Sequence, residues 1–211
     1  LVTRKEVTHK DYNAVFWFNI SISLCLYLVL FLCAPLIADF YKTPELKSLA
    51  RYAFTGFVIA SLGISHSAYL QRNLMIKQRS LSMVIGVTIS GIAGVTLAYL
   101  GFSYWGYATQ GIVYVAVNTA CNWYFSSWRP TFEFNLAPIK QMFGFSGKLL
   151  ITNIFNHINN NLFSVILGKF YTEKEVGYYN QANKWCGMGQ LFISGMINGV
   201  AQPVLTKVSD D

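Results

Sequence analysis

Charged residues are scarce in this sequence. Asp, Glu, Lys and Arg make up 12% of its 211 residues, while hydrophobic residues make up 54%. A soluble domain usually carries about 25% charged residues. Residues 80–128 contain no charge at all, and an uncharged run of that length exceeds what a buried helix of a soluble protein needs. The scarcity excludes an ordinary soluble domain and predicts an all-α, polytopic transmembrane helix bundle.

Paired cysteines are absent as well. The cysteines stand singly in apolar stretches, without the close spacing that metal sites and redox motifs require. We interpret them as small buried hydrophobic residues, because a free cysteine is usually buried. They are Cys25, Cys33, Cys121 and Cys186.

The histidines do not form a catalytic cluster in the sequence. His9, His66 and His157 are far apart, and none has a carboxylate or a second ligand at a catalytic or metal-binding spacing. The sequence therefore predicts no metal site, no cofactor and no enzymatic activity.

Long apolar runs predict about six membrane spans, since a hydrocarbon core of about 30 Å needs roughly 20 helical residues. Gly101 and Gly106 mark a tight turn between the third and fourth spans. Arg51, in the first turn of the second span, is expected to extend to the membrane interface. The six predicted spans are 14–38, 49–69, 80–101, 104–127, 148–168 and 176–204.

One polar segment, residues 128–147, separates the spans into two groups. We interpret 1–127 as four helices of a first bundle, 128–147 as a cytoplasmic connection, and 148–211 as the first two helices of a second bundle. The chain begins with Leu1 and has no secretion signal at its start. We therefore expect it to be a fragment of a longer protein.

Basic residues in the loops predict the orientation, because they favour the cytoplasmic side. One side of the membrane would receive Arg4, Lys5, Lys10, Arg72, Lys77, Arg79, Arg129, Lys140, Lys148 and Lys207. The other side would receive Lys42, Lys47, Lys169 and Lys174. The first side is predicted to be cytoplasmic. The net charge of +7 does not indicate nucleic-acid binding, since the basic residues lie between apolar spans and not in one cluster on a soluble module.

Acidic residues are missing from the middle of every predicted span. A proton-coupled exporter of cationic drugs generally needs an intramembrane carboxylate that binds the cation and carries the proton. The sequence therefore disfavours that class. All acidic residues fall in loops or at span ends, at Glu6, Asp11, Asp39, Glu45, Glu133, Glu173, Glu175, Asp210 and Asp211.

Basic and amide side chains do occur in the last two predicted spans. Asn153, Asn156 and Asn160 recur at helical spacing and would form a polar stripe suited to sugar hydroxyls. Lys148 and Lys184 lie at or within spans, where a charge is costly unless it faces water or an anion. The alternative is structural: the amides would tie helices together and the lysines would reach the interface.

A basic loop, residues 71–79, follows the second span. Its Arg72 and Arg79 are candidate cytoplasmic contacts for anionic headgroups or for a lipid-linked pyrophosphate. The alternative is that the loop only sets the topology.

Several short strings carry a family resemblance. The most specific is Ala-Pro-Leu-Ile-Ala-Asp-Phe-Tyr at 34–41. The others are Val15-Phe16-Trp17, residues 68–72, Leu100-Gly101, Tyr104-Trp105-Gly106, Trp128-Arg129-Pro130 and residues 177–182. Over nearly its whole length the chain resembles the polysaccharide and lipopolysaccharide exporters of the multidrug, oligosaccharidyl-lipid and polysaccharide flippase superfamily.

The resemblance implies a larger two-bundle transporter, a multi-pass protein of the bacterial cytoplasmic membrane, of which this chain would be a fragment that supplies helices three to eight. It also implies alternating access, in which an undecaprenyl-pyrophosphate-linked oligosaccharide enters from the cytoplasm and leaves outside. Membrane lipids and polysaccharide assembly proteins would be its partners. The cavity would be lined by Lys148, Asn153, Asn156, Asn160 and Lys184.

Two other functions stay open at this stage. A cation or drug antiporter of the same architecture would need a carboxylate in helices outside this chain. A membrane-embedded polysaccharide polymerase would need a large outer loop with paired catalytic groups, and the predicted outer loops are short.

Overall fold

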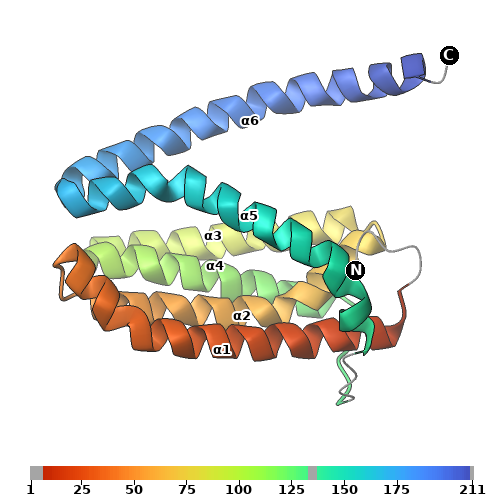
Figure 1. Cartoon of the computed structure of the whole chain (residues 1–211), viewed down its shortest axis with the longest axis horizontal. Coiled ribbons are helices and arrows are strands. Elements are labelled where there is room, and N and C mark those ends of the chain that lie inside the picture. The colour runs from red at the N-terminus through yellow and green to blue at the C-terminus, as the bar shows by residue number, and fades with distance from the viewer. Residues whose placement is uncertain (1–6, 133–136, 210–211) are drawn as a thin grey trace. The chain divides into compact units, whose positions relative to one another are not determined.

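The computed structural model describes residues 7–132 and 137–209, and every regular element within those ranges is an α-helix (Figure 1). The prediction of an all-α bundle of six long helices is confirmed. The helices are α1 (His9–Tyr41), α2 (Leu46–Arg72), α3 (Ile76–Tyr99), α4 (Ser103–Phe125), α5 (Ala137–Phe170) and α6 (Glu173–Ser209).

Three of the described helices, α1, α2 and α3, are long enough and apolar enough to cross a membrane. Helix α4 is of similar length and carries amide side chains on the side that faces α3. A Cβ atom on Gly94 of α3 would lie 3.0 Å from the Gln110 amide carbon, and one on Gly86 would lie 3.6 Å from the Asn118 Cβ. The amides of α4 therefore lie within the bundle, which lowers the apolar character of α4 without exposing polar groups to lipid.

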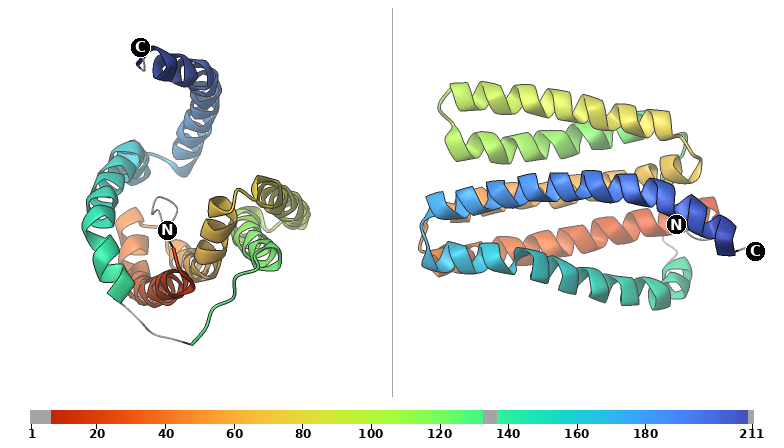
Figure 2. Two further views of the ribbon diagram at one scale, coloured as in Figure 1. Left: turned by 90° about the vertical axis from the view of Figure 1, so that its right-hand side faces the viewer. Right: turned by 90° about the horizontal axis from the view of Figure 1, so that it is seen from above.

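The chain divides into two compact units, Leu1–Lys148 and Leu149–Asp211. In the first unit, α1 packs on α2, α2 packs on α4, and α4 packs on α3, so the four helices lie side by side in the order α1, α2, α4, α3 (Figure 2). Short turns connect α1 to α2, α2 to α3 and α3 to α4. Helix α4 thus joins the two hairpins of this unit.

The second unit is a helical hairpin. Ser164 of α5 donates a hydrogen bond to Asn180 of α6 at 2.6 Å, and the rings of Phe163 and Tyr179 are 6.4 Å apart. The assignment of the two units to two bundles of a longer transporter stays a prediction.

Two of the described helices, α1 and α6, begin with a capping box. In each box a Thr is followed three residues later by an acidic residue. Thr8 donates its backbone N–H and its hydroxyl to Asp11 at 2.8 Å each. Thr172 donates the same two groups to Glu175 at 2.9 and 2.8 Å. These bonds, the backbone one first, hold the pKa of Glu175 below its ordinary value. Each box satisfies donors that a helix start leaves unpaired.

Close packing in the first unit depends on glycine. A Cβ atom on Gly63 of α2 would lie 2.8 Å from the Thr119 hydroxyl of α4, and one on Gly106 of α4 would lie 3.3 Å from the Leu97 Cβ of α3. Small residues let helix backbones approach closely, and such packing holds membrane helices together because lipid supplies no hydrophobic driving force between them.

A proline and an arginine join α1 to α2. Pro35 has no N–H, so it leaves the Phe31 carbonyl, its i−4 partner in α1, without the usual helical donor. Arg51 of α2 donates its Nε–H to that carbonyl at 3.3 Å, and its guanidinium lies 4.1 Å from the centre of the Phe31 ring. The expected extension of Arg51 toward the interface is therefore wrong: the side chain turns onto α1 and replaces the missing donor.

Three other expectations can be compared with the structure. The tight turn is confirmed at Gly101, whose φ is 85°. Helix α5 begins at Ala137, inside the segment treated as a connection, because Pro138 falls in its first turn, where a proline costs no helical hydrogen bond. Burial of all four cysteines is wrong, since Cys25 and Cys186 are exposed. On a membrane protein an apolar side chain can face lipid without the cost of exposure to water.

The Pro35–Arg51 pairing predicts non-additive stability. Replacing Arg51 by Gln should cost about 1–3 kcal/mol, the usual cost of leaving a buried carbonyl unpaired. In a Pro35→Ala background the helix supplies its own donor to Phe31, so the same replacement should cost clearly less. Unfolding of the four variants in detergent measures the coupling. Equal costs in both backgrounds would show that Arg51 does not act through the Phe31 carbonyl.

The glycines of α2 offer a matched pair of substitutions. Gly63→Ala should lower the free energy of unfolding by about 1–3 kcal/mol, the usual range for overpacking, because its Cβ would meet Thr119. Gly56 has nothing within 4 Å of the same position, so Gly56→Ala should be neutral or stabilise by up to about 1 kcal/mol. Adding Thr119→Ala should rescue Gly63→Ala. The idea fails if the two alanine variants unfold alike.

Candidate functional site

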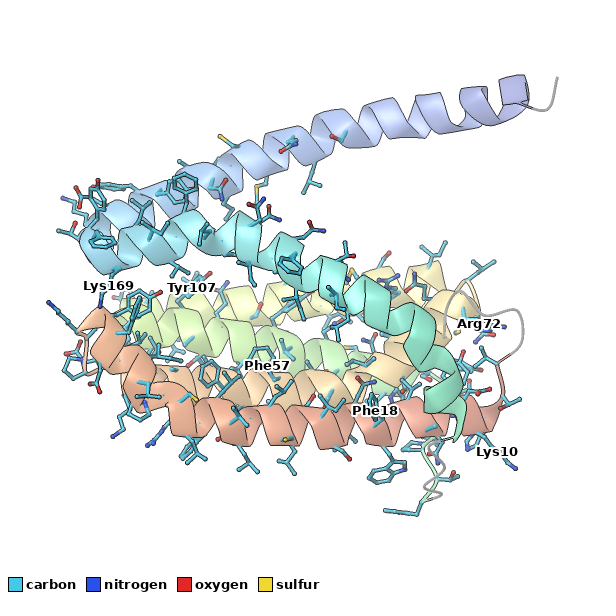
Figure 3. All side chains as sticks on the ribbon, in the orientation of Figure 1. Lys10, Phe18, Phe57, Arg72, Tyr107 and Lys169 are labelled. Carbon is cyan, nitrogen blue, oxygen red and sulfur yellow. The ribbon has the colours of Figure 1, made fainter. Side chains whose placement is uncertain are left out.

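Positively charged side chains gather at one end of the first unit, which we call the basic end. The start of α1, the end of α2, the start of α3 and the segment after α4 all meet there. Figure 3 shows two of these residues, Lys10 and Arg72, at the same end of the unit, with Tyr107 toward the other end. The residues of the basic end are Lys10, Arg72, Lys77, Arg79 and Arg129.

A tight turn connects the end of α2 to the start of α3, and each of these helix ends carries an arginine. Helix α2 ends at Arg72, and the Asn73 side chain donates to the Tyr69 carbonyl at 2.9 Å. Leu74 then adopts a φ of 53°, which is unusual for a residue other than glycine. Helix α3 starts two residues later, at Ile76. The turn therefore keeps Arg72 and Arg79 at the same end of the unit.

Positive side chains outnumber acidic ones at this end. Among its described residues the one acidic side chain is Asp11, which is buried and accepts the two hydrogen bonds from Thr8. The Nε of Arg79 is buried and has no hydrogen-bond partner among the described residues. A buried guanidinium nitrogen without an acceptor is costly, so this end is suited to an added anion.

The segment after α4, residues 126–132, folds back onto the start of α1, and we call it the clasp. The Thr131 backbone N–H donates to the Asn13 side-chain oxygen at 2.9 Å, and the Trp17 indole N–H donates to the Thr131 carbonyl at 2.8 Å. Arg129 donates to the Ser126 and Trp128 carbonyls within the clasp, the second at 2.8 Å. These bonds fix the chain where it leaves α4.

Aromatic rings fill the space between the clasp and the helices. His66 of α2 is fully buried and stacks on Trp123 of α4, with ring centres 4.2 Å apart. Trp128 of the clasp lies 5.0 Å from His66 and 5.7 Å from Phe16. The Trp123 indole N–H donates to the Leu62 carbonyl at 2.8 Å. Three helices and the clasp thus share one aromatic core at the basic end.

Sequence reasoning did not find this aromatic core. It treated the histidines as separate, yet His9 and His66 both lie against Trp128, at 5.9 and 5.0 Å. No carboxylate joins them, and no group of three metal-binding side chains occurs among the described residues. The one available signal was the Trp128-Arg129-Pro130 string, which resembles a family motif but says nothing of its neighbours in space.

The other predicted site residues belong to the α5–α6 hairpin. Asn153, Asn156 and Asn160 are all exposed on α5, and Lys184 is exposed on α6. Lys148 lies in α5, and its side chain lies outside the described residues. The Ser164–Asn180 bond sets the register of the hairpin. Because Asn160 precedes Ser164 by one helical turn and Lys184 follows Asn180 by one turn, these two residues lie at the same level of the hairpin.

Comparison with known proteins gives one family across the whole chain. The family model described as "Polysaccharide biosynthesis protein" matches residues 1–211. The teichuronic acid biosynthesis protein TuaB of Bacillus subtilis is 28% identical over 98% of this chain and 43% of its own length. The lipopolysaccharide biosynthesis protein WzxC of Escherichia coli is 26% identical over 100% of this chain and 43% of its own length.

A third relative is named as a transport protein. The succinoglycan biosynthesis transport protein ExoT of Rhizobium meliloti is 24% identical over 100% of this chain and 43% of its own length. The chain therefore spans less than half the length of these relatives. No solved structure matches it.

The clasp can be tested by hydrogen exchange. Asn13→Ala removes the acceptor of the Thr131 amide, so exchange of that amide should accelerate about tenfold, which corresponds to a lost bond of about 1.4 kcal/mol. Asn19→Ala is the control, because the Asn19 amide bonds only to its own helix at Val15. Mass spectrometry of a peptide covering 126–132 gives the rates. Similar acceleration in both variants would exclude a specific clasp.

Proposed function

The chain belongs to the polysaccharide biosynthesis protein family, and from that premise we propose that it helps to move lipid-linked oligosaccharides across the bacterial cytoplasmic membrane. The proposed cargo is an undecaprenyl-pyrophosphate-linked repeat unit, carried by alternating access and not by a chemical reaction. The proposal concerns the activity of a whole protein, while this chain matches 43% of the length of its curated relatives.

The basic end is the observation that carries the proposal. Four chain segments bring five positive side chains together there, and Asp11 is the one acidic side chain among the described residues of this end. Pyrophosphate is an anion that guanidinium groups bind with paired hydrogen bonds. In the predicted orientation the basic end faces the cytoplasm, where lipid-linked repeat units would be loaded. Arg72 and Arg79 would then contact the pyrophosphate.

The α5–α6 hairpin would supply contacts for the sugars. Amide side chains donate and accept hydrogen bonds, so Asn153, Asn156 and Asn160 suit sugar hydroxyls. Lys184, at the level of Asn160, would bind an anionic group of the cargo, and Lys148 would do the same nearer the cytoplasm. In these roles the five residues would favour anionic, hydroxyl-rich cargo.

The family favours this function over the two alternatives. A cation antiporter would need a carboxylate deep in a span, and Asp11 and Asp39 of α1 lie only in its first and last turns. A polymerase would be an enzyme, whereas the Rhizobium relative is named as a transport protein. Membrane lipids and polysaccharide assembly proteins remain the proposed partners.

Charge removal at the basic end tests the proposal. Arg72→Gln with Arg79→Gln should lower uptake of lipid-linked oligosaccharide by about tenfold or more in proteoliposomes of the complete protein, since two charge-assisted bonds are lost. Arg72→Lys with Arg79→Lys should keep part of the activity, because charge remains but paired hydrogen bonding is lost.

The control residues are Lys42, in the loop after α1, and Lys47, in the first turn of α2. Lys42→Gln with Lys47→Gln removes the same charge from the opposite end of the unit and should leave transport unchanged. Equal transport by the wild type and the Arg72/Arg79 glutamine variant would refute the cytoplasmic pyrophosphate contact. A complete protein that moves no lipid-linked oligosaccharide at all would refute the proposed function.

A further inference from the structure

A cavity of about 330 Å³ opens at the end of the first unit opposite the basic end. It lies where the start of α2, the end of α3 and the start of α4 meet. Small-molecule sites are usually cavities of about 300–1,000 Å³ with mainly apolar and aromatic walls and a few polar groups. The residues that line the cavity are Tyr52, Leu97, Phe102, Trp105 and Thr109.

Two hydroxyl groups supply the polar part of the lining. The Tyr52 hydroxyl and the Thr109 hydroxyl lie 3.1 Å apart and share a hydrogen bond. Each oxygen has further capacity to accept, and one of the two hydroxyl hydrogens remains free for a ligand. The pair can therefore recognise a molecule that both donates and accepts hydrogen bonds.

Two aromatic rings supply flat apolar walls. The rings of Tyr52 and Trp105 have centres 5.6 Å apart and are inclined at 59°, so they form walls at an angle and do not stack on each other. Phe102 adds a third ring and is 53% exposed. A ligand that fits this lining needs a flat apolar face and hydroxyls at its edge, which is the chemistry of a sugar ring.

The charge and the position of the cavity argue against an anion and against an acyl chain as its occupant. None of its five lining residues is charged, so nothing in the lining would balance a phosphate. Exposed tyrosines surround the α3–α4 turn, with Tyr99 at 92% and Tyr107 at 78% exposure. Tyrosines of this kind lie at the headgroup level of a membrane. A lipid headgroup region favours an amphipathic ring over an acyl chain, which lies deeper.

We propose that this cavity binds a neutral sugar ring at the outer end of the first unit. This inference rests on the proposed function, because the ring would be part of an oligosaccharide on its way out of the transporter. Trp105 and Tyr52 hold the apolar face of the ring, and Thr109 with the Tyr52 hydroxyl bonds its hydroxyl groups. The basic end holds the anionic part of the cargo and the outer cavity holds an uncharged part.

Cysteine protection in the complete protein tests the cavity directly. Leu97→Cys, in a background in which every native cysteine is replaced by serine, places a thiol in the lining. Methyl glucoside, methyl galactoside and methyl N-acetylglucosaminide are added in turn, and labelling by a water-soluble maleimide is followed. At least one of these sugars should slow labelling fivefold or more. Mannitol, an acyclic polyol without a ring face, should not.

The controls separate binding from folding and from transport. Tyr107 lies outside the lining, so the thiol of Tyr107→Cys should be labelled at the same rate with and without sugar. Trp105→Ala and the smaller change Thr109→Val should each abolish protection of the Leu97→Cys thiol, while size-exclusion profiles stay unchanged.

Three outcomes would overturn the inference: no sugar protects, mannitol protects equally, or protection survives Trp105→Ala and Thr109→Val. Faster labelling on removal of lipid, with no effect of sugar, would assign the cavity to an acyl chain instead. If proteoliposomes of the wild type fail to transport while protection persists, the proposed function fails and the sugar site stands. If transport is normal and protection is absent, the cavity inference fails alone.

Discussion

The bundle depends on hydrogen bonds that side chains of one element donate to backbone carbonyls of another. Some of these carbonyls have no donor in their own helix, and others accept a second hydrogen bond. Lipid offers no hydrogen bonds, so a carbonyl freed within a membrane must find a donor in the protein. Arg51 supplies that donor to the Phe31 carbonyl, which Pro35 leaves free. In the clasp, outside the helices, the Trp17 indole N–H donates to the Thr131 carbonyl and joins α1 to the segment after α4. Each of these bonds joins two elements, so the requirement for backbone pairing also fixes which elements are neighbours.

Side-chain donors of α4 also need partners, and their bonds to α2 help to explain why α4 joins the two hairpins of the first unit. The Trp123 indole donates to the Leu62 carbonyl of α2, and the Thr119 hydroxyl reaches the Ile59 carbonyl one turn away at 3.4 Å. Gly63 makes this approach possible, since any larger residue would meet Thr119. On its other side α4 lies against Gly86 and Gly94 of α3. Glycine brings the backbones close, and side-chain donors then reach carbonyls across the interface.

The two ends of the first unit differ in chemistry, and the difference is relevant to the proposed transport. The basic end combines arginines with an aromatic core around His66, and the clasp fixes the point at which the chain leaves α4. The opposite end combines aromatic walls with hydroxyls and no charge in its cavity lining. A lipid-linked oligosaccharide has the same two parts, an anionic pyrophosphate and uncharged sugar rings, so each end would bind a different part of one cargo.

Much of this protein follows from its sequence alone. Scarcity of charge and runs of apolar residues predicted six helices, because a membrane permits few other structures. Gly101 marked the turn between α3 and α4, since only glycine readily adopts its φ of 85°. Lysine and arginine in the loops indicated a basic end, because consecutive antiparallel helices return alternate loops to the same side. These features are local or periodic, and a sequence records such features directly.

Only the tertiary structure decided which residues meet. His66, Trp123 and Trp128 lie on three segments, and Arg51 finds a carbonyl twenty residues earlier in the chain. The cavity combines Tyr52 with Trp105 and Thr109 of another helix. Such contacts depend on helix rotation and on how closely backbones approach. In an apolar sequence of this kind, where most faces of a helix are hydrophobic, periodicity cannot indicate the rotation of each helix.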